Sequence, residues 1–109
     1  MPTTHFHKIV RDKVPELIRK SGAKPITRVM PVDDFARMLR EKLVEEAREV
    51  KGAKAYDSIV GELADVMEVV ASIQKILGIS GQALSAARRK KLKERGGFTK
   101  RILLESVEE

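Results

Sequence analysis

The sequence predicts an all-helical domain, built as an antiparallel helical bundle, and three observations support this prediction. Three long segments place apolar residues at the i, i+3, i+4 spacing of an amphipathic helix. Pro31, Gly52, Gly78 and the pair Gly96-Gly97 stand at the edges of these segments, where helices commonly begin and end. The connection between the first two segments is short, which favours antiparallel neighbours.

The bulk composition fits one globular domain spanning residues 1–109, with 42% hydrophobic residues. Cysteine is absent, which excludes disulfides, thiolate metal sites and a cysteine nucleophile. No apolar run reaches the roughly 18 residues of a membrane span. The first ten residues are polar and do not form a signal-peptide core. We therefore expect a cytoplasmic protein with no membrane partner.

The first long helix is expected from about Asp33 to Lys51, following the break at Pro31. Asp33 and Asp34 offer an N-cap, and Gly52 offers a stop. Its apolar residues recur at helical spacing, at Phe35, Leu39, Leu43, Ala47 and Val50.

The second long helix is expected from about Asp57 to Leu77, ending at Gly78. Apolar residues cover most of its girth rather than one narrow stripe, and such a helix is buried on several sides. Because the chain is short, we expect part of this apolar surface to meet another subunit.

The third long helix is expected after Ile79, with Ser80 as its N-cap, and runs to about Glu94. One face carries a dense set of cations, namely Arg88, Arg89, Lys90, Lys91, Lys93 and Arg95.

The two ends of the chain give weaker patterns. Asp12 can cap a short helix that tolerates Pro15 in its first turn. Residues 25–30 and 100–107 contain β-branched residues with partial alternation, which allows a small antiparallel β-ribbon between them.

Charge is distributed unevenly along the chain. Residues 1–30 carry 7 basic and 2 acidic residues, residues 31–76 carry 7 and 10, and residues 77–109 carry 8 and 4. An acidic centre between basic ends suits a ligand that combines a metal cation with phosphates. A solvated surface rich in lysine, arginine and glutamate is the competing interpretation.

Two acid-x-x-acid pairs stand on the first two helices, Glu46 with Glu49 and Glu62 with Asp65. Residues three apart lie on neighbouring positions of one helix face, so two antiparallel helices can bring four carboxylates together. Such pairs are also common on solvated helix faces, and one pair alone would not indicate a site.

Helical phase favours a site over a solvated face. At about 100° per residue, Glu46 and Glu62 project onto the apolar sides of their helices, and Lys42 lies in the same stripe as Glu46. Two carboxylates about 4 Å apart repel each other by roughly a few kcal/mol at an effective dielectric near 20. Lys42 alone cannot neutralise four such acids. Oxygen ligands without histidine or cysteine point to Mg²⁺, with Mn²⁺ as the alternative. A buried ion-pair network is the competing interpretation.

With these acids in place, the sequence resembles the all-α NTP pyrophosphatase superfamily, which includes MazG-type enzymes, dimeric dUTPases and phosphoribosyl-ATP pyrophosphohydrolases. The resemblance begins with Glu45-Glu46-x-x-Glu49 followed by Glu62-x-x-Asp65. Residues 8–15, Lys-Ile-Val-Arg-Asp-Lys-Val-Pro, are similar to the opening of a MazG-like subgroup often labelled phosphoribosyl-ATP pyrophosphohydrolase-like. Lys91-x-x-x-Arg95-Gly96-Gly97-Phe98 resembles its closing motif.

The resemblance implies a four-helix fold, a homodimer or homotetramer, and Mg²⁺-dependent cleavage of a nucleotide between its α and β phosphates. The products would be a nucleoside monophosphate and pyrophosphate. Carried over by position, the metal ligands would be Glu46, Glu49, Glu62 and Asp65. Glu45 projects farther from the apolar stripe, and would either orient water as a base or be merely solvated.

The chemistry requires neutralised phosphates and an aligned water. A carboxylate not saturated by metal can accept the proton, and we expect Glu49 in that role rather than Glu46 because it lies toward the edge of the stripe. Lysine and arginine are the usual phosphate ligands. The expected substrate-binding residues are Arg11, Lys13, Lys42, Lys91 and Arg95.

Alternative functions remain open at this point. Within the enzymes, the runner-up to nucleotide house-cleaning is the phosphoribosyl-ATP pyrophosphohydrolase of histidine biosynthesis. The basic third helix can also bind a nucleic-acid backbone, although no aromatic platform or helix-turn-helix pattern accompanies it, so nucleic acid is not the expected partner. A third possibility is a non-catalytic helical interaction module with a metal-stabilised core.

Overall fold

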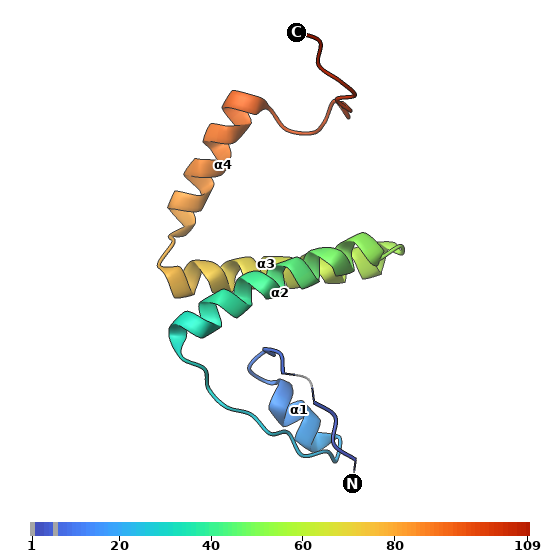
Figure 1. Cartoon of the computed structure of the whole chain (residues 1–109), viewed down its shortest axis with the longest axis vertical. Coiled ribbons are helices and arrows are strands. Elements are labelled where there is room, and N and C mark those ends of the chain that lie inside the picture. Colours follow the sequence, from blue (N-terminus) through green and yellow to red (C-terminus); the bar gives the residue numbers. More distant parts are fainter. Residues whose placement is uncertain (1, 6) are drawn as a thin grey trace.

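A computed structural model describes residues 2–5 and 7–109 of the chain. This part of the chain contains four helices and no strand, which confirms the all-helical prediction (Figure 1). The helices are α1 Val14–Lys20, α2 Val32–Gly52, α3 Tyr56–Leu77 and α4 Gly81–Arg95. None of these helices is long and apolar enough to cross a bilayer.

The predicted β-ribbon is wrong, because residues 25–30 and 100–107 contain no strand. Their apolar side chains, such as Ile26 and Val29, are exposed and have no sheet to pack against. A lone two-stranded ribbon is at best marginally stable in water, so partial alternation was not enough to form one.

Helix α2 begins directly after Pro31, whose extended backbone stands at the N-cap position. No side chain caps this terminus; Asp33 and Asp34, predicted as caps, lie in the first turn instead. There their negative charges interact favourably with the positive end of the helix dipole. The sequence therefore located the helix start correctly and misassigned the role of its acids.

Helices α2 and α3 form an antiparallel hairpin, as the short connection between them predicted (Figure 1). Leu39 of α2 is 4% exposed and Val69 of α3 is 8% exposed, and these two form the centre of the small core. Helix α3 ends where Gly78 adopts a left-handed conformation, with φ of 69°. That conformation costs glycine little and terminates the helix where the sequence predicted.

The two shorter helices are fixed mainly by local signals. In α1 the N-cap position is Lys13 rather than the predicted Asp12, and Pro15 occupies the first turn. A proline tolerates that position because its missing N–H would have no helical partner there. In α4 the Ser80 hydroxyl accepts a hydrogen bond from the Ala83 N–H at 3.0 Å, which confirms the predicted cap.

The single chain is extended rather than compact. Its radius of gyration is 18.6 Å, whereas about 13 Å is typical for a compact domain of this length. Within the described residues, the extensive helix–helix contact is between α2 and α3, and α4 projects away from the hairpin (Figure 1). One chain therefore supplies a helical hairpin with two appended arms, and not a closed four-helix bundle.

Candidate metal and nucleotide site

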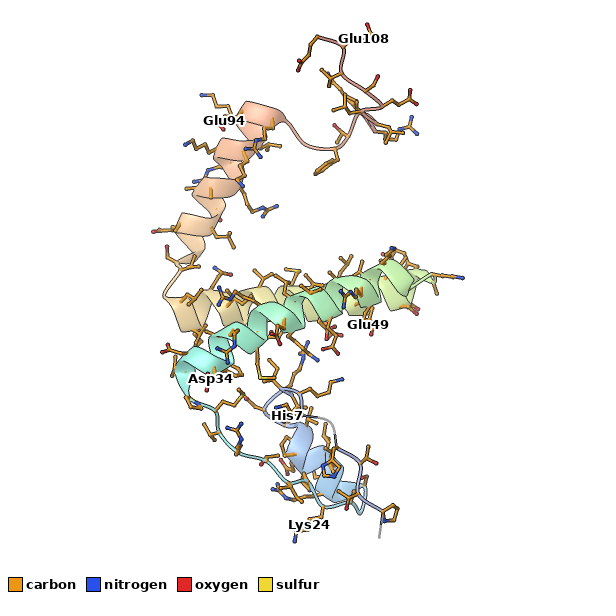
Figure 2. The ribbon with its side chains drawn as sticks, viewed as in Figure 1. His7, Lys24, Asp34, Glu49, Glu94 and Glu108 are labelled. Carbon is orange, nitrogen blue, oxygen red and sulfur yellow. The ribbon has the colours of Figure 1, made fainter. Side chains whose placement is uncertain are left out.

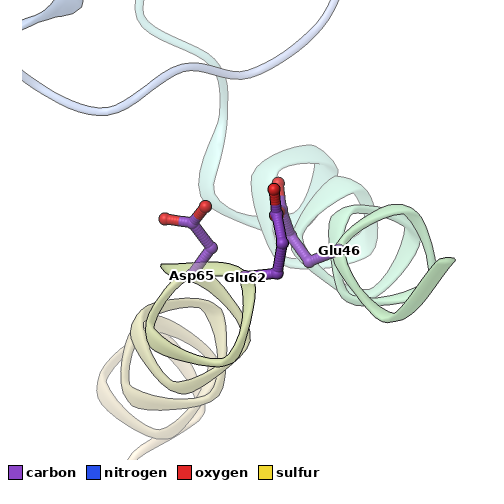
Figure 3. A group of neighbouring side chains, drawn as sticks. All are labelled: Glu46, Glu62 and Asp65. Carbon is purple, nitrogen blue, oxygen red and sulfur yellow. The ribbon is translucent and has the colours of Figure 1, made fainter. Parts of the chain in front are cut away.

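Three acidic side chains converge between α2 and α3. Glu46 from α2 and Glu62 and Asp65 from α3 each offer a carboxylate oxygen, and these oxygens all lie within 4.8 Å of one another (Figure 3). We call this group the acidic triad. The arrangement arises because acids three or four residues apart share one helix face and the hairpin sets the two faces side by side.

The fourth predicted ligand, Glu49, does not join this group. It lies on α2 near the triad but is exposed, and its side chain projects from the hairpin (Figure 2). The sequence correctly indicated that Glu49 lies toward the edge of the apolar stripe.

The electrostatics of the triad show excess negative charge. Partial loss of solvent raises the pKa of Glu62, and the charges of Asp65, Glu49 and Glu46 raise it further. The Glu46 side chain is only 12% exposed, so solvent screens its charge poorly. This set of carboxylates therefore favours a bound cation.

Two lysines form ion pairs with Glu45, the residue just before the triad member Glu46. The Glu45 carboxylate lies 3.3 Å from Lys8 and 3.4 Å from Lys42, and Lys42 is also 3.4 Å from Glu46. Limited burial acts to raise the pKa of Glu45, but the hydrogen bond from Lys8 and the charge of Lys42 outweigh it, so the pKa is lowered overall. Glu45 is thus an ion-paired carboxylate, neither freely solvated nor poised to take a proton.

The segment of residues 8–13, which we call the N-terminal strap, lies against the triad. The Arg11 guanidinium donates a hydrogen bond to the Asp65 carboxylate at 2.6 Å. Both side chains remain partly exposed, so the pair can open without removing an apolar cover. The strap therefore brings Arg11, near the start of the chain, to an acid 54 residues later.

A cavity of about 770 Å³ lies between the strap and the hairpin. Phe35, Leu39 and Val69 form its apolar wall, and the strap, Lys42, Glu46 and Asp65 line the rest. Arg11, Lys13 and Lys42 are thus three predicted substrate-binding residues that the fold places in one cavity.

Glu68 and Ser72 also line the cavity, and sequence reasoning missed both residues. Glu68 stands three residues after Asp65 and Ser72 four residues after Glu68, so both follow the triad along one face of α3. That spacing was the signal available in the sequence.

The two remaining predicted substrate ligands lie elsewhere in the single chain. Lys91 and Arg95 line a separate cavity of about 730 Å³ on α4, together with Arg88 and Phe98. This cavity shares no residue with the one beside the triad. We call it the α4 groove; the fold does not join it to the strap and the hairpin within one chain.

The triad suits a small divalent cation. Its donors are all carboxylate oxygens, the ligands that Mg²⁺ and Mn²⁺ prefer. Two oxygens bound to one Mg²⁺ lie at most about 4.2 Å apart, and the triad oxygens lie within 4.8 Å of one another. The three side chains would therefore have to rotate toward one another to bind one Mg²⁺.

Comparison with known proteins adds one partial likeness. An uncharacterized protein of Mycolicibacterium smegmatis is 41% identical over 51 residues, which is 47% of this chain and 52% of that protein. The chain thus covers about half the length of this curated relative. No family model matches the chain, and no solved structure matches it.

Proposed function

We propose that this protein is a Mg²⁺-dependent nucleotide pyrophosphohydrolase, which cleaves the α–β phosphoanhydride to give a nucleoside monophosphate and pyrophosphate. The observation that carries the proposal is the acidic triad, three carboxylates from two helices within 4.8 Å, placed beside a cavity edged by cations. Removal of unwanted nucleotides is the role that the resemblance of the opening and closing motifs favours.

In this proposal, Glu46, Glu62 and Asp65 hold the metal. Bound Mg²⁺ would neutralise phosphate charge and lower the pKa of a bound water. Glu46 is the most enclosed of the three, and its contact with Lys42 fixes the side chain at one corner of the triad. The chain itself supplies the orientation of the ligands, because both helices of the hairpin are held by their packed core.

Glu49 serves as the general base. It stands close enough to the triad for its charge to raise the pKa of Glu62, yet it is exposed and outside the ligand group. A carboxylate in that position can accept the proton of an attacking water without being saturated by metal. Glu45 is a poorer choice because its pKa is lowered by contact with Lys8 and Lys42, against the opposing effect of limited burial.

Arg11 has two anionic partners available in this mechanism. Without metal it neutralises Asp65 through the 2.6 Å hydrogen bond. With Asp65 engaged as a metal ligand, the Arg11 guanidinium would be free to turn toward the phosphates of a substrate, which it can grip with two parallel hydrogen bonds. Lys13 on the same strap adds a second positive charge at the cavity.

The cavity itself fits the rest of a nucleotide. Its volume of about 770 Å³ falls within the roughly 300–1,000 Å³ that small-molecule sites occupy. The apolar wall formed by Phe35, Leu39 and Val69 can contact the base, while Glu68 and Ser72 offer polar atoms for orientation. Phosphoribosyl-ATP is a larger nucleotide substrate of the same chemistry and belongs in any substrate screen.

The α4 groove supports a second candidate function, binding of a nucleic-acid backbone. Arg88, Lys91 and Arg95 line it, and the Phe98 side chain beside them is 97% exposed. Cations with an exposed aromatic ring can bind phosphates and stack on a base. We place this function second because it leaves the acidic triad unexplained.

A pyrophosphate-release screen tests the proposal. Canonical and damaged nucleoside triphosphates, their deoxy forms and phosphoribosyl-ATP are offered with Mg²⁺, with Mn²⁺ and with EDTA. The substitution Glu62→Gln should reduce kcat/KM at least about 100-fold. The reason is that a bound metal lowers the activation barrier by several kcal/mol, and each 1.36 kcal/mol of barrier is a factor of ten in rate. Glu41→Gln, an exposed α2 residue outside the triad, is the matched control and should retain activity.

Two results would contradict the proposal. One is metal-independent turnover, and the other is equal turnover by Glu62→Gln and by the wild type. A salt-sensitive shift of DNA or RNA on a gel, with no pyrophosphate released from any nucleotide, would favour the second function.

A further inference from the structure

Two ion pairs join the N-terminal strap to the hairpin. Near the start of the strap, the Lys8 ammonium lies 3.3 Å from the Glu45 carboxylate of α2. Near its end, the Arg11 guanidinium donates the 2.6 Å hydrogen bond to Asp65 of α3. The strap therefore contacts both helices of the hairpin, and Figure 1 shows this part of the chain between α1 and the hairpin.

Little apolar packing holds the strap in this position. Ile9 is partly exposed, Val10 is 50% exposed, and the remaining strap residues are exposed. Helix α1, which follows the strap, makes no extensive contact with any other helix of the described residues. An exposed ion pair shifts an equilibrium by no more than about fivefold. The strap can therefore move away while the hairpin stays folded, and the two ion pairs favour its closed position.

Asp65 serves the strap and the acidic triad at once. Its carboxylate accepts the hydrogen bond from Arg11, and it also contributes to the three carboxylates whose oxygens lie within 4.8 Å of one another. A carboxylate that binds a divalent cation attracts a guanidinium less strongly, and the cation itself repels the guanidinium. This argument holds for either oxygen of Asp65, so metal binding and the Arg11 contact oppose each other.

The ion pair of Lys8 is connected to the triad through Lys42. The Lys42 ammonium lies 3.4 Å from both Glu45 and Glu46, so it is shared between the partner of Lys8 and a member of the triad. If Glu46 binds metal, Glu45 becomes the main partner of Lys42, and Lys42 then competes with Lys8 for it. Positive charge at the triad therefore weakens both contacts of the strap.

We propose that the N-terminal strap is a lid on the cavity, closed by its ion pairs with Glu45 and Asp65 and opened when the acidic triad binds a divalent cation. The inference rests on the metal site of the proposed function and adds an order of binding to it. The strap residues line the cavity of about 770 Å³, so their movement gives a nucleotide access to that space. Metal binding thus precedes and favours binding of the nucleotide, whose phosphates attract the cations of the open strap.

The two equilibria are linked thermodynamically. The factor by which the closed strap weakens metal binding equals the factor by which bound metal weakens closure of the strap. Arg11 therefore opposes metal binding. An arginine that oriented Asp65 for the metal would instead strengthen metal binding, so the sign of the effect of a substitution separates the two roles.

Spin labels report the position of the strap without any need for catalytic activity. The chain has no cysteine, so His7→Cys, directly before the strap, and Val44→Cys on α2 provide the two labelling sites. Both residues are exposed and neither lines the cavity. Pulsed electron paramagnetic resonance then gives the distribution of distances between the two labels. Mg²⁺ is diamagnetic and does not disturb this measurement.

The labelled parent should give a narrow distribution in EDTA. Arg11→Ala and Asp65→Asn should each give a broader distribution with longer distances in EDTA, because each removes the ion pair between these two residues. Mg²⁺ should broaden the distribution of the parent in the same way, and should change that of Arg11→Ala much less.

The strap lysines provide a matched pair of variants. Lys8→Ala removes the ion pair with Glu45 and should open the strap partly. Lys13 has no acidic partner within 4.0 Å among the described residues, so Lys13→Ala should leave the strap closed. Both substitutions remove one positive charge from the lining of the same cavity.

Metal affinity gives the reciprocal measurement. Mn²⁺ titrated into the unlabelled proteins, without substrate, should bind Arg11→Ala about two- to fivefold more tightly than the wild type, the range expected when one exposed ion pair no longer competes. Lys8→Ala should strengthen binding by a smaller factor. Lys13→Ala measures the general effect of losing a positive charge near the triad, and its effect should be smaller than that of Arg11→Ala.

Three results would overturn the inference. The strap of the parent could be as open in EDTA as that of Arg11→Ala, Mg²⁺ could bind without moving the strap, or Arg11→Ala could bind Mn²⁺ more weakly than the wild type. If the wild type binds no metal, the metal site of the proposed function fails and opening by metal fails with it. If metal binds and opens the strap but no nucleotide is hydrolysed, the proposed activity fails and the lid stands.

Discussion

The α2–α3 hairpin and helix α4 are similar in sequence character but differ in how they are held. Both are rich in charged residues, yet the hairpin has a packed core at Leu39 and Val69, and α4 buries no residue. Helix α4 is instead bounded by the Ser80 cap and by Gly96, where the backbone turns away. The difference teaches that capping and spacing define where a helix lies, while packing decides which helices form a rigid unit.

The two regions also differ in whether their charged side chains form ion pairs within the chain. Acids of the hairpin meet cations of the strap and of α2 within the chain, as in the Arg11–Asp65 and Lys42–Glu46 pairs. Among the described residues, the ion pairs within 4.0 Å do not include any residue of α4. The cations of α4 therefore remain available to an anionic ligand (Figure 2).

A pair of leucine substitutions should give the largest contrast between the two regions. Leu39→Ala removes a buried side chain from the hairpin core and should cost about 2–4 kcal/mol in the free energy of unfolding. Leu92 on α4 is 59% exposed, so Leu92→Ala should cost about 0.5 kcal/mol or less. Urea unfolding of both variants measures the difference, and equal losses would show that α4 is packed in solution.

A smaller effect is expected in substrate binding at the α4 groove. The resemblance of the closing motif implies that cations of the α4 groove contact the phosphates of a substrate. In that case Arg95→Ala should raise KM about tenfold, because it removes roughly one charged hydrogen bond to the substrate. The matched control is Lys90→Ala, on the same helix but outside the groove. Steady-state kinetics on the best substrate gives the comparison. An unchanged KM for Arg95→Ala would confine the site to the strap and the hairpin.

The smallest effect is a pH dependence of stability without metal. The pKa of Glu62 is raised above its ordinary 4.5, by partial desolvation first and then by neighbouring acids. The folded chain therefore binds this proton more tightly than the unfolded chain, and its contribution to stability is lost as pH rises from 4.5 through the folded pKa. Unfolding in EDTA over that range should show the wild type losing stability relative to Glu62→Gln. If the free energies of unfolding of the two proteins changed in parallel with pH, the raised pKa of Glu62 would be contradicted.

The sequence predicted the three long helices to within one or two residues at each end, because periodic apolar positions and glycine stops are local signals. It also predicted that acids on two helices meet, since a short connection forces an antiparallel hairpin. It could not reveal that Arg11 contacts Asp65, because that contact depends on the path of the strap through space. The separation of the α4 groove from the triad was equally hidden, since it depends on the direction in which α4 leaves Gly78.

Direct binding of a divalent cation to the acidic triad is the most decisive measurement. Mn²⁺ can be titrated into the metal-free protein and followed by its paramagnetic resonance signal, without substrate. We predict saturable binding by the wild type and by Glu41→Gln, and binding weakened at least about tenfold in Glu62→Gln and in Asp65→Asn, since each loses one charged ligand. Equal affinity in all four proteins, or no saturable binding in the wild type, would contradict the assignment of these three carboxylates as a metal site.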